Sequence, residues 1–303
     1  MVAHSHQLAA ADGTSLYVSD YLLPLADARG GIVIMHGLGE HSGRYRRLAQ
    51  RLNEAGWSVR CYDHRGHGRS QGARGDIPNG TPMLQDGQII VDDFTARTGM
   101  RPFLLGHSMG GLFAAHFALA RLSPLRGLIL SSPALAVRLS SLQLTLLKGM
   151  RAVAPGLGLP NGLQSQFLSH DAAVVAAYRA DPLVHNKISA RLLSAMLASI
   201  AYCHAQAAAL AVPALLLVAG DDHLVDASGS ARFCAKLPAG RAAMTRYDTL
   251  YHEIFNETGT DQPFSDLHAW LEARNAFAAH GSGMPHDQRI DGGDDGTGNP
   301  YRP

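Results

Sequence analysis

A candidate nucleophile lies near the middle of the chain, between an apolar run and an alanine-rich segment. Residues 103–105 read Phe-Leu-Leu, residues 106–110 read Gly-His-Ser-Met-Gly, and residues 111–120 have a helix-compatible composition. In this pattern the serine occupies a sharp turn from strand to helix, which exposes its hydroxyl above a sheet. The two glycines allow the strand and helix backbones to pass closely. The spacing therefore predicts Ser108 as a catalytic nucleophile.

A serine hydroxyl is a weak nucleophile, so it needs a base, and the base needs an orienting carboxylate. In the α/β-hydrolase arrangement these residues follow one another in the order Ser, Asp or Glu, His. His252 follows the last predicted strand and is expected to be the base. The acid is expected after the preceding strand, where three candidates stand: Asp221, Asp222 and Asp226. Asp226 precedes a helix and suits an N-cap better. The pattern alone does not separate Asp221 from Asp222.

Two backbone N–H groups are expected to stabilise the oxyanion that forms during acyl transfer. Met109 begins the predicted helix, where N–H groups lack intrahelical partners, and Leu38 follows His36-Gly37 at the end of another strand. In the expected reaction His252 takes the proton of Ser108, the serine attacks an ester carbonyl, and water then releases the acyl group. This chemistry requires no metal and no organic cofactor.

Strands alternate with helices along most of the chain, which predicts a mostly parallel, doubly wound sheet. A hairpin is expected within residues 7–23. Further strands are predicted at 31–35, 57–62, 103–105, 125–130, 213–219 and 242–247, and helices at 44–55, 83–98, 111–120, 227–237 and 262–279. Ligands of such sheets collect beyond the carboxyl ends of the strands. The polar clusters of this sequence lie at those ends, so we expect the site there.

One long insert and one polar tail interrupt this alternation. Residues 1–133 and 208–280 are expected to form the core domain. Residues 134–207 look helical, and an insert of this length is more typical of a lid than of a linker; we expect a helical cap. Residues 281–303 lack apolar content and are expected to be a disordered tail.

Composition excludes several classes of function. The chain has 303 residues, with 26 Lys and Arg against 25 Asp and Glu, so nothing indicates a nucleic-acid partner. Three widely spaced cysteines without a CxxC pair indicate neither a zinc site nor a disulfide framework. The first residues lack the features of a signal peptide, and the apolar run at 207–219 is too short to span a bilayer. A cytoplasmic location is therefore expected.

Several motifs together carry a family resemblance. They are the segments at 36–45 (HGLGEHSGRY), 63–70 (DHRGHGRS), 106–111 (GHSMGG), 178–183 (YRADPL) and 222–226 (DHLVD), followed by His252. Over about residues 8–275 the sequence resembles the monoacylglycerol lipase and lysophospholipase group of serine α/β-hydrolases. The first motif is far more specific than Gly-x-Ser-x-Gly.

The resemblance implies an α/β-hydrolase fold with a cap and Asp222 as the acid of the triad. It implies a lipid ester as substrate, above all a monoacylglycerol, with an apolar acyl tunnel beneath the cap. Glu40, Arg44 and Tyr178 would lie near the glycerol end. Human-type members carry a second histidine shortly after the catalytic one, whereas this chain has Phe255. The resemblance therefore does not extend to that head-group contact.

Other functions fit the sequence less well. A dinucleotide-binding oxidoreductase would use Gly37-x-Gly39 and Asp63, but Ser42 breaks the G-x-G-x-x-G spacing and the predicted triad would be idle. A binding protein without turnover would lack a triad member. Within hydrolases, a lysophospholipase, a general carboxylesterase and a peptidase acting on small substrates stay open. We also expect transient contact of the cap with a membrane surface; the sequence does not indicate an oligomeric state.

Overall fold

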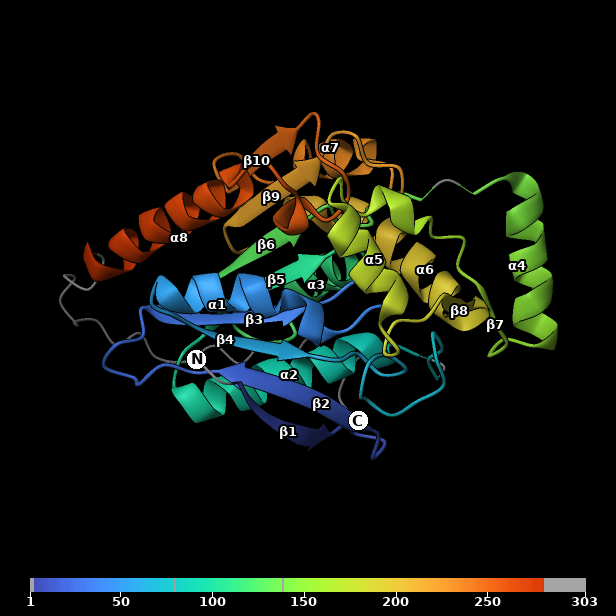
Figure 1. Cartoon of the computed structure of the whole chain (residues 1–303), viewed down its shortest axis with the longest axis horizontal. Helices are drawn as coiled ribbons and strands as arrows, with labels where there is room; N and C mark the ends of the chain where they lie inside the picture. The colour runs from blue at the N-terminus through green and yellow to red at the C-terminus, as the bar shows by residue number, and fades with distance from the viewer. Residues whose placement is uncertain (1–2, 79, 138, 281–303) are drawn as a thin grey trace, which may run out of the picture.

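An eight-stranded sheet forms the centre of the computed structural model, which describes residues 3–78, 80–137 and 139–280 (Figure 1). The predicted disordered tail, residues 281–303, lies outside them. The strand order is β1-β2-β4-β3-β5-β6-β9-β10. The pairs β1–β2 and β2–β4 are antiparallel and all other pairs are parallel. The strands are β1 (His4–Ala9), β2 (Ser15–Tyr21), β3 (Gly30–Met35), β4 (Trp57–Tyr62), β5 (Pro102–His107), β6 (Gly127–Ser131), β9 (Ala214–Ala219) and β10 (Ala242–Tyr247). The predicted fold class is confirmed.

Helices cover both faces of this sheet because successive side chains of a strand point to opposite faces. Ile32 of β3 belongs to the apolar cluster that includes Leu48 of α1 and Trp270 of α8. Its neighbour Val33 belongs to the opposite cluster, with Phe94 of α2 and the residues of α3. The helices of the core are η1 (Ser42–Tyr45), α1 (Arg46–Glu54), α2 (Pro82–Thr98), α3 (Met109–Leu119), α7 (Ser228–Cys234), η4 (Ile254–Asn256) and α8 (Gln262–His280).

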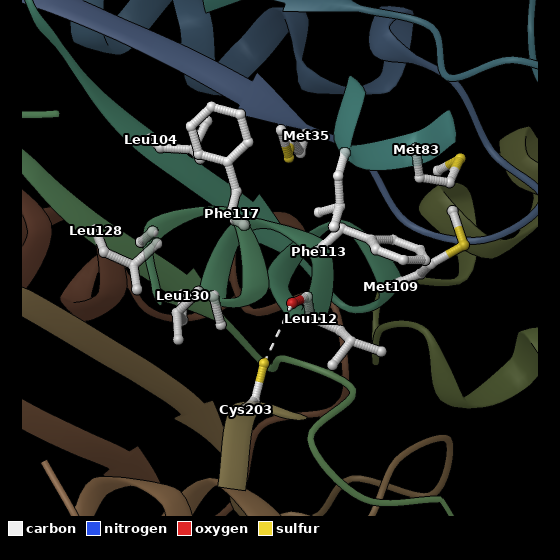
Figure 2. Close-up of a cluster of buried hydrophobic side chains, with 14 of the residues drawn as sticks. Met35, Met83, Leu104, Met109, Leu112, Phe113, Phe117, Leu128, Leu130 and Cys203 are labelled. Carbon is white, nitrogen blue, oxygen red and sulfur yellow. Dashed lines mark hydrogen bonds between the residues drawn. The ribbon is translucent and has the colours of Figure 1, made fainter. Parts of the chain in front are cut away.

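Helix α3 lies within the larger apolar cluster (Figure 2). Leu112 and Phe117 of this helix share that cluster with Leu104 of β5 and Leu128 of β6. The thiol of Cys203, on the neighbouring helix α6 (Ala190–Gln206), lies 3.9 Å from the carbonyl oxygen of Leu112. Burial of a large apolar side chain stabilises a fold by about 1.5–3 kcal/mol. The helix that begins next to Ser108 is therefore held firmly.

The long insert between β6 and β9 contains helices, as predicted, and one unexpected strand pair. Its other elements are α4 (Ser141–Val153), β7 (Gly158–Pro160), η2 (Ser165–Phe167), α5 (Ala172–Ala180), β8 (Lys187–Ser189) and η3 (Ala207–Ala209). Strands β7 and β8 have three residues each, too few to leave a periodic pattern in the sequence. Helix α4 lies at the periphery of the molecule in Figure 1, in contact with α6, and none of its residues is buried.

By length and composition alone, the segment Ala190–Ala209 is apolar enough to cross a membrane. In this fold it packs against α3. Ser199 hydrogen-bonds His116 of α3 at 2.9 Å, and Cys203 contacts the Leu112 carbonyl. The core helix of a globular protein meets the same test.

The turn from β5 to α3 forces Ser108 into a strained conformation. Its φ is 54° and its ψ is −119°, a region that serine rarely adopts. A β-carbon on Gly106 would lie 2.4 Å from the carbonyl oxygen of Gly110, and one on Gly110 would lie 2.2 Å from that of Met35. Glycine is required at both positions because three backbone segments meet there.

Gly110→Ala should lower the free energy of unfolding by about 1–3 kcal/mol because the new methyl group has no room against β3. Gly149→Ala is the matched control, since nothing lies within 4 Å of a β-carbon placed there on α4. Alanine should stabilise that exposed helix by up to about 1 kcal/mol. Urea unfolding followed by circular dichroism measures both effects. Equal stability of the two variants would contradict this account of the turn.

Candidate active site

Ser108 borders a cavity of about 360 Å³ at the carboxyl edge of the sheet. Core residues and insert residues line it together, including Leu38, Met109, His252, Asn161, Leu193 and Met196. A cavity of this size lies within the range of small-molecule sites. The strained serine therefore opens onto a partly enclosed space lined by both apolar and polar groups.

His252 and Asp222 form a buried pair beside this cavity. The Nδ1 atom of His252 lies 2.7 Å from Oδ2 of Asp222, and the two side chains are 3% and 0% exposed. The other oxygen, Oδ1, accepts the N–H groups of Leu224 at 2.9 Å and Val225 at 3.0 Å. The loop after β9 thus fixes the carboxylate, and the carboxylate fixes the imidazole.

Each member of this pair favours the charged form of the other. Burial alone would raise the pKa of Asp222, but the charge and hydrogen bond of His252, together with two backbone N–H groups, hold it below its usual value. Burial alone would lower the pKa of His252, but Asp222 raises it. An imidazolium formed at this position is therefore stabilised, as a general base requires.

The structure distinguishes the three carboxylates that were candidates for the acid beside His252. Asp222 contacts the imidazole of His252. Asp221 is exposed and lies 3.0 Å from the ring of His223. Asp226 accepts the N–H of Ser228 at the start of α7, at 3.1 Å. Adjacent positions at a strand end point in different directions. For this reason the side chain of Asp222 is buried, whereas its neighbour Asp221 is exposed to solvent.

Within the described part of the chain, the Ser108 hydroxyl makes no hydrogen bond to His252, although both residues border the cavity. Asp222 occupies Nδ1 of the ring, which leaves Nε2 for the serine. Catalytic hydrogen bonds are often long or poorly aligned before substrate binds. The structure therefore shows the acid–base contact of the predicted triad, but not its contact with the serine.

Two residues that line this cavity carry backbone N–H groups that could act as donors. Among the described residues, the N–H groups of Leu38 and Met109 have no acceptor, and both residues line the cavity. Met109 is the first residue of α3, where helical N–H groups are free. The loop before Leu38 is fixed because the N–H of Gly37 donates to Oε1 of Glu40 at 2.6 Å. The two free donors could hold an oxyanion.

Glu40, Arg44 and Tyr178 do not line the cavity at Ser108, in contrast to the expectation from the resemblance. They belong to a buried ionic cluster beneath the Leu38 loop. Arg44 lies 2.8 Å from Glu40, pairs with both oxygens of Glu253, and stacks 4.7 Å from the ring centre of Tyr178. A void of about 20 Å³ adjoins Glu40 and Arg44, which is room for about one water. These residues position the loop.

The sequence analysis missed two residues next to the predicted triad. Glu253 follows His252 directly, and its pairing with Arg44 needed a contact across 209 positions that no local pattern reveals. The ring of His107 lies 4.7 Å from that of His252, and its Nδ1 lies 3.1 Å from the Ser131 hydroxyl. Burial and the nearby His252 lower the pKa of His107 to about 3, so it is neutral.

Fold and site together define a serine hydrolase with the α/β-hydrolase fold. The family model described as serine aminopeptidase, S33 matches residues 26–259, and the chain belongs to this family.

Relatives and solved structures agree with this assignment. The monoacylglycerol lipase of Mycolicibacterium smegmatis is 34% identical over 278 residues, which cover 88% of this chain and 96% of that protein. The phospholipase YtpA of Bacillus subtilis is 34% identical, covering 80% of this chain and 94% of that protein. The crystal structure of Paleococcus ferrophilus monoacylglycerol lipase shares 35% identity with a TM-score of 0.77, covering 86% of this chain and 99% of that one. The resemblance inferred from the motifs is confirmed.

Arg44→Met should lower the free energy of unfolding at pH 7 by about 3–5 kcal/mol, because Glu40 and Glu253 stay buried without their cation. Burial alone would raise the pKa of Glu40. The nearby charge of Arg44 is the main cause that lowers this pKa, to about 2 from a usual 4.5. The stabilisation by Glu40 is therefore complete above about pH 4.5 and is lost as the pH falls toward 2.

Urea unfolding at pH 7 and pH 3 measures this effect, with Arg46→Met as the control because Arg46, two positions further along at the start of α1, is exposed. The difference between wild type and Arg44→Met should shrink at pH 3. A difference that stays constant over this range would contradict the ionic account.

Proposed function

We propose that this chain hydrolyses monoacylglycerols to a free fatty acid and glycerol through a triad of Ser108, His252 and Asp222. One observation carries the proposal: the strained serine, the carboxylate-bound imidazole and two unpaired N–H groups all border one cavity of about 360 Å³. The relatives named monoacylglycerol lipase supply the substrate class.

In the proposed reaction, Nε2 of His252 takes the hydroxyl proton of Ser108 as its oxygen attacks the acyl carbonyl. The N–H groups of Leu38 and Met109 donate to the oxygen that becomes negative. The imidazolium, stabilised by Asp222, returns the proton to the departing glycerol oxygen. Water then attacks the acyl-serine with His252 again as base, which releases the fatty acid.

The chemistry of the cavity wall supports a substrate with one apolar and one small polar part. Leu139, Leu193 and Met196 offer apolar surface for an acyl chain. The side-chain amide Nδ2 of Asn161 is buried without a partner in the described part of the chain, and Asn161 lines the same cavity. A buried donor without an acceptor favours a ligand that supplies one, such as a glycerol hydroxyl.

A lysophospholipase is the second candidate, because a phospholipase is among the relatives. The described residues that line the cavity include no lysine and no arginine, and they include Asp226. A phosphate group would therefore enter without a cation to pair with it. This charge pattern favours the neutral glycerol head group over a phosphate-bearing one.

The wild-type enzyme should hydrolyse 1-monoacylglycerol at least about tenfold more efficiently than lysophosphatidylcholine of the same acyl chain, because the wall lacks a phosphate partner. Ser108→Ala should lower kcat by at least about 10⁴-fold on either substrate. Fatty-acid release measures both, beside p-nitrophenyl esters of rising chain length. The reverse preference would indicate a lysophospholipid as the substrate. An active Ser108→Ala variant would contradict the proposed mechanism.

We further propose that α4 brings the cap to a lipid surface for transient contact, with the enzyme peripheral to the membrane. Leu142 is 69% exposed, Leu146 58% and Val153 85%. Contiguous exposed apolar side chains are typical of interaction sites. Leu139 and Gln143, at the start of this helix, line the cavity. The apolar face therefore adjoins the place where a lipid would enter.

The double variant Leu142→Ser/Leu146→Ser should lower the rate on monoacylglycerol in vesicles by about tenfold or more, because about 3–6 kcal/mol of apolar burial is at stake. Its rate on soluble p-nitrophenyl acetate should equal that of the wild type. Leu25→Ser is the matched control, since Leu25 is also 69% exposed but lies on the core. Equal loss in both variants on vesicles would refute a role for α4.

A further inference from the structure

The backbone of the catalytic-histidine loop is joined to one segment of the cap, residues 167–170. The N–H of Glu253 donates to the carbonyl oxygen of Leu168 at 2.8 Å, and the N–H of His252 donates to that of Phe167 at 3.4 Å. These contacts join positions that are about 85 residues apart in the sequence. The orientation of His252 therefore depends on a segment outside the core domain.

A buried carboxylate, Glu257, fastens this segment to the loop. Its Oε1 accepts the N–H of Tyr251 at 2.7 Å from the histidine loop and lies 2.9 Å from Nδ1 of His170 in the cap. Its Oε2 accepts the N–H of His170 at 3.0 Å and the hydroxyl of Ser169 at 3.2 Å. The side chain of Glu257 is 1% exposed. One carboxylate thus satisfies donors from both sides of the junction, and a buried network of this kind is rigid only while it is complete.

Two ring stacks extend the same junction to both the acid and the base. The ring of His170 stacks on Tyr251, which precedes His252, with centroids 3.6 Å apart. The ring of Phe167 stacks on His223, which follows Asp222, with centroids 4.1 Å apart. The four residues 167–170 therefore contact the sequence neighbours of both members of the acid–base pair.

We propose that Glu257 is a positioning residue that makes the alignment of His252 depend on the docking of cap residues 167–170. The proposal rests on the role of His252 given under the proposed function. When the segment is docked, the imidazole is held toward Asp222 and the cavity. When it is undocked, the loop loses its two backbone acceptors and the base loses its alignment.

Glu257→Gln tests this proposal, because the amide keeps the shape but turns a donor toward donors that need an acceptor. On p-nitrophenyl acetate we expect kcat to fall about 10- to 100-fold, as a small misplacement of a catalytic group does, with KM within twofold. The rate at which a small fluorophosphonate labels Ser108 should fall in parallel. A merely structural role would lower the melting temperature without separating kcat from KM.

Asp76→Asn is the matched control. Asp76 is another buried carboxylate of the core that pairs with a cap residue, Arg191, with its Oδ1 3.1 Å from Nε, but it does not touch the histidine loop. This variant should lose stability and keep kcat and the labelling rate within twofold. Equal losses of kcat in the two variants, or a Glu257→Gln enzyme with wild-type kcat, would overturn the proposal.

A second variant covers the case in which Glu257→Gln does not fold. His170→Phe keeps the ring stacked on Tyr251 but removes the Nδ1 contact with Glu257, and the same fall in kcat and labelling is expected. Wild-type values in this variant would also overturn the proposal. Labelling of Ser108 does not depend on the natural ester, so these outcomes are independent of which lipid the enzyme prefers.

Discussion

Backbone crowding at residues 106–110 is the constraint on which the site depends. Strand β5, helix α3 and the end of β3 approach one another so closely that no β-carbon fits at Gly106 or Gly110. This approach turns the chain sharply and leaves Ser108 at φ 54°, above the sheet rather than within it. The same turn starts α3 at Met109, which lines the cavity. Nucleophile and oxyanion donor thus arise from one local geometry, and the packing of α3 into the core keeps it in place.

Buried charges hold the loops that complete this edge of the sheet. Asp63 accepts the N–H groups of Ser42 and Arg69, both at 2.7 Å, which ties the loop after β4 to the loop after β3. Arg65 makes two hydrogen bonds to Asp86 of α2, at 2.6 and 2.7 Å. Breaking such buried pairs is costly because one charge would stay uncompensated. The charged residues of the motif at 63–70 therefore act by fixing loops rather than by reacting with a substrate.

Local signals predicted most of the fold and the nucleophile, whereas the rest depended on contacts between distant residues. Apolar runs predicted the buried parallel strands of the central sheet, because such a strand leaves a continuous pattern. The hairpin predicted within residues 7–23 corresponds to β1 and β2, although β1 already begins at His4. The helix predicted at 227–237 is shorter, Ser228–Cys234, since helix ends depend on tertiary packing. The place of Glu40 and Arg44 beneath the loop depends on Glu253, which pairs with Arg44 and which no local pattern links to them. Likewise, the pattern of residues did not separate Asp221 from Asp222; the resemblance favoured Asp222, and the fold places its carboxylate against His252.

The positions of the polar and apolar side chains around the cavity indicate the side from which a lipid could enter it. The charged acid–base pair lies on the core side, fixed by the loops after β9 and β10, while the exposed leucines lie on α4 at the far side of the cap. An amphiphile approaching from a lipid surface would meet α4 first. Its acyl chain could follow apolar surface from Leu139 to Met196, and its ester would come last to Ser108. Because residues 167–170 of the same cap contact the neighbours of both His252 and Asp222, a displacement of this segment would also change the surroundings of the acid–base pair.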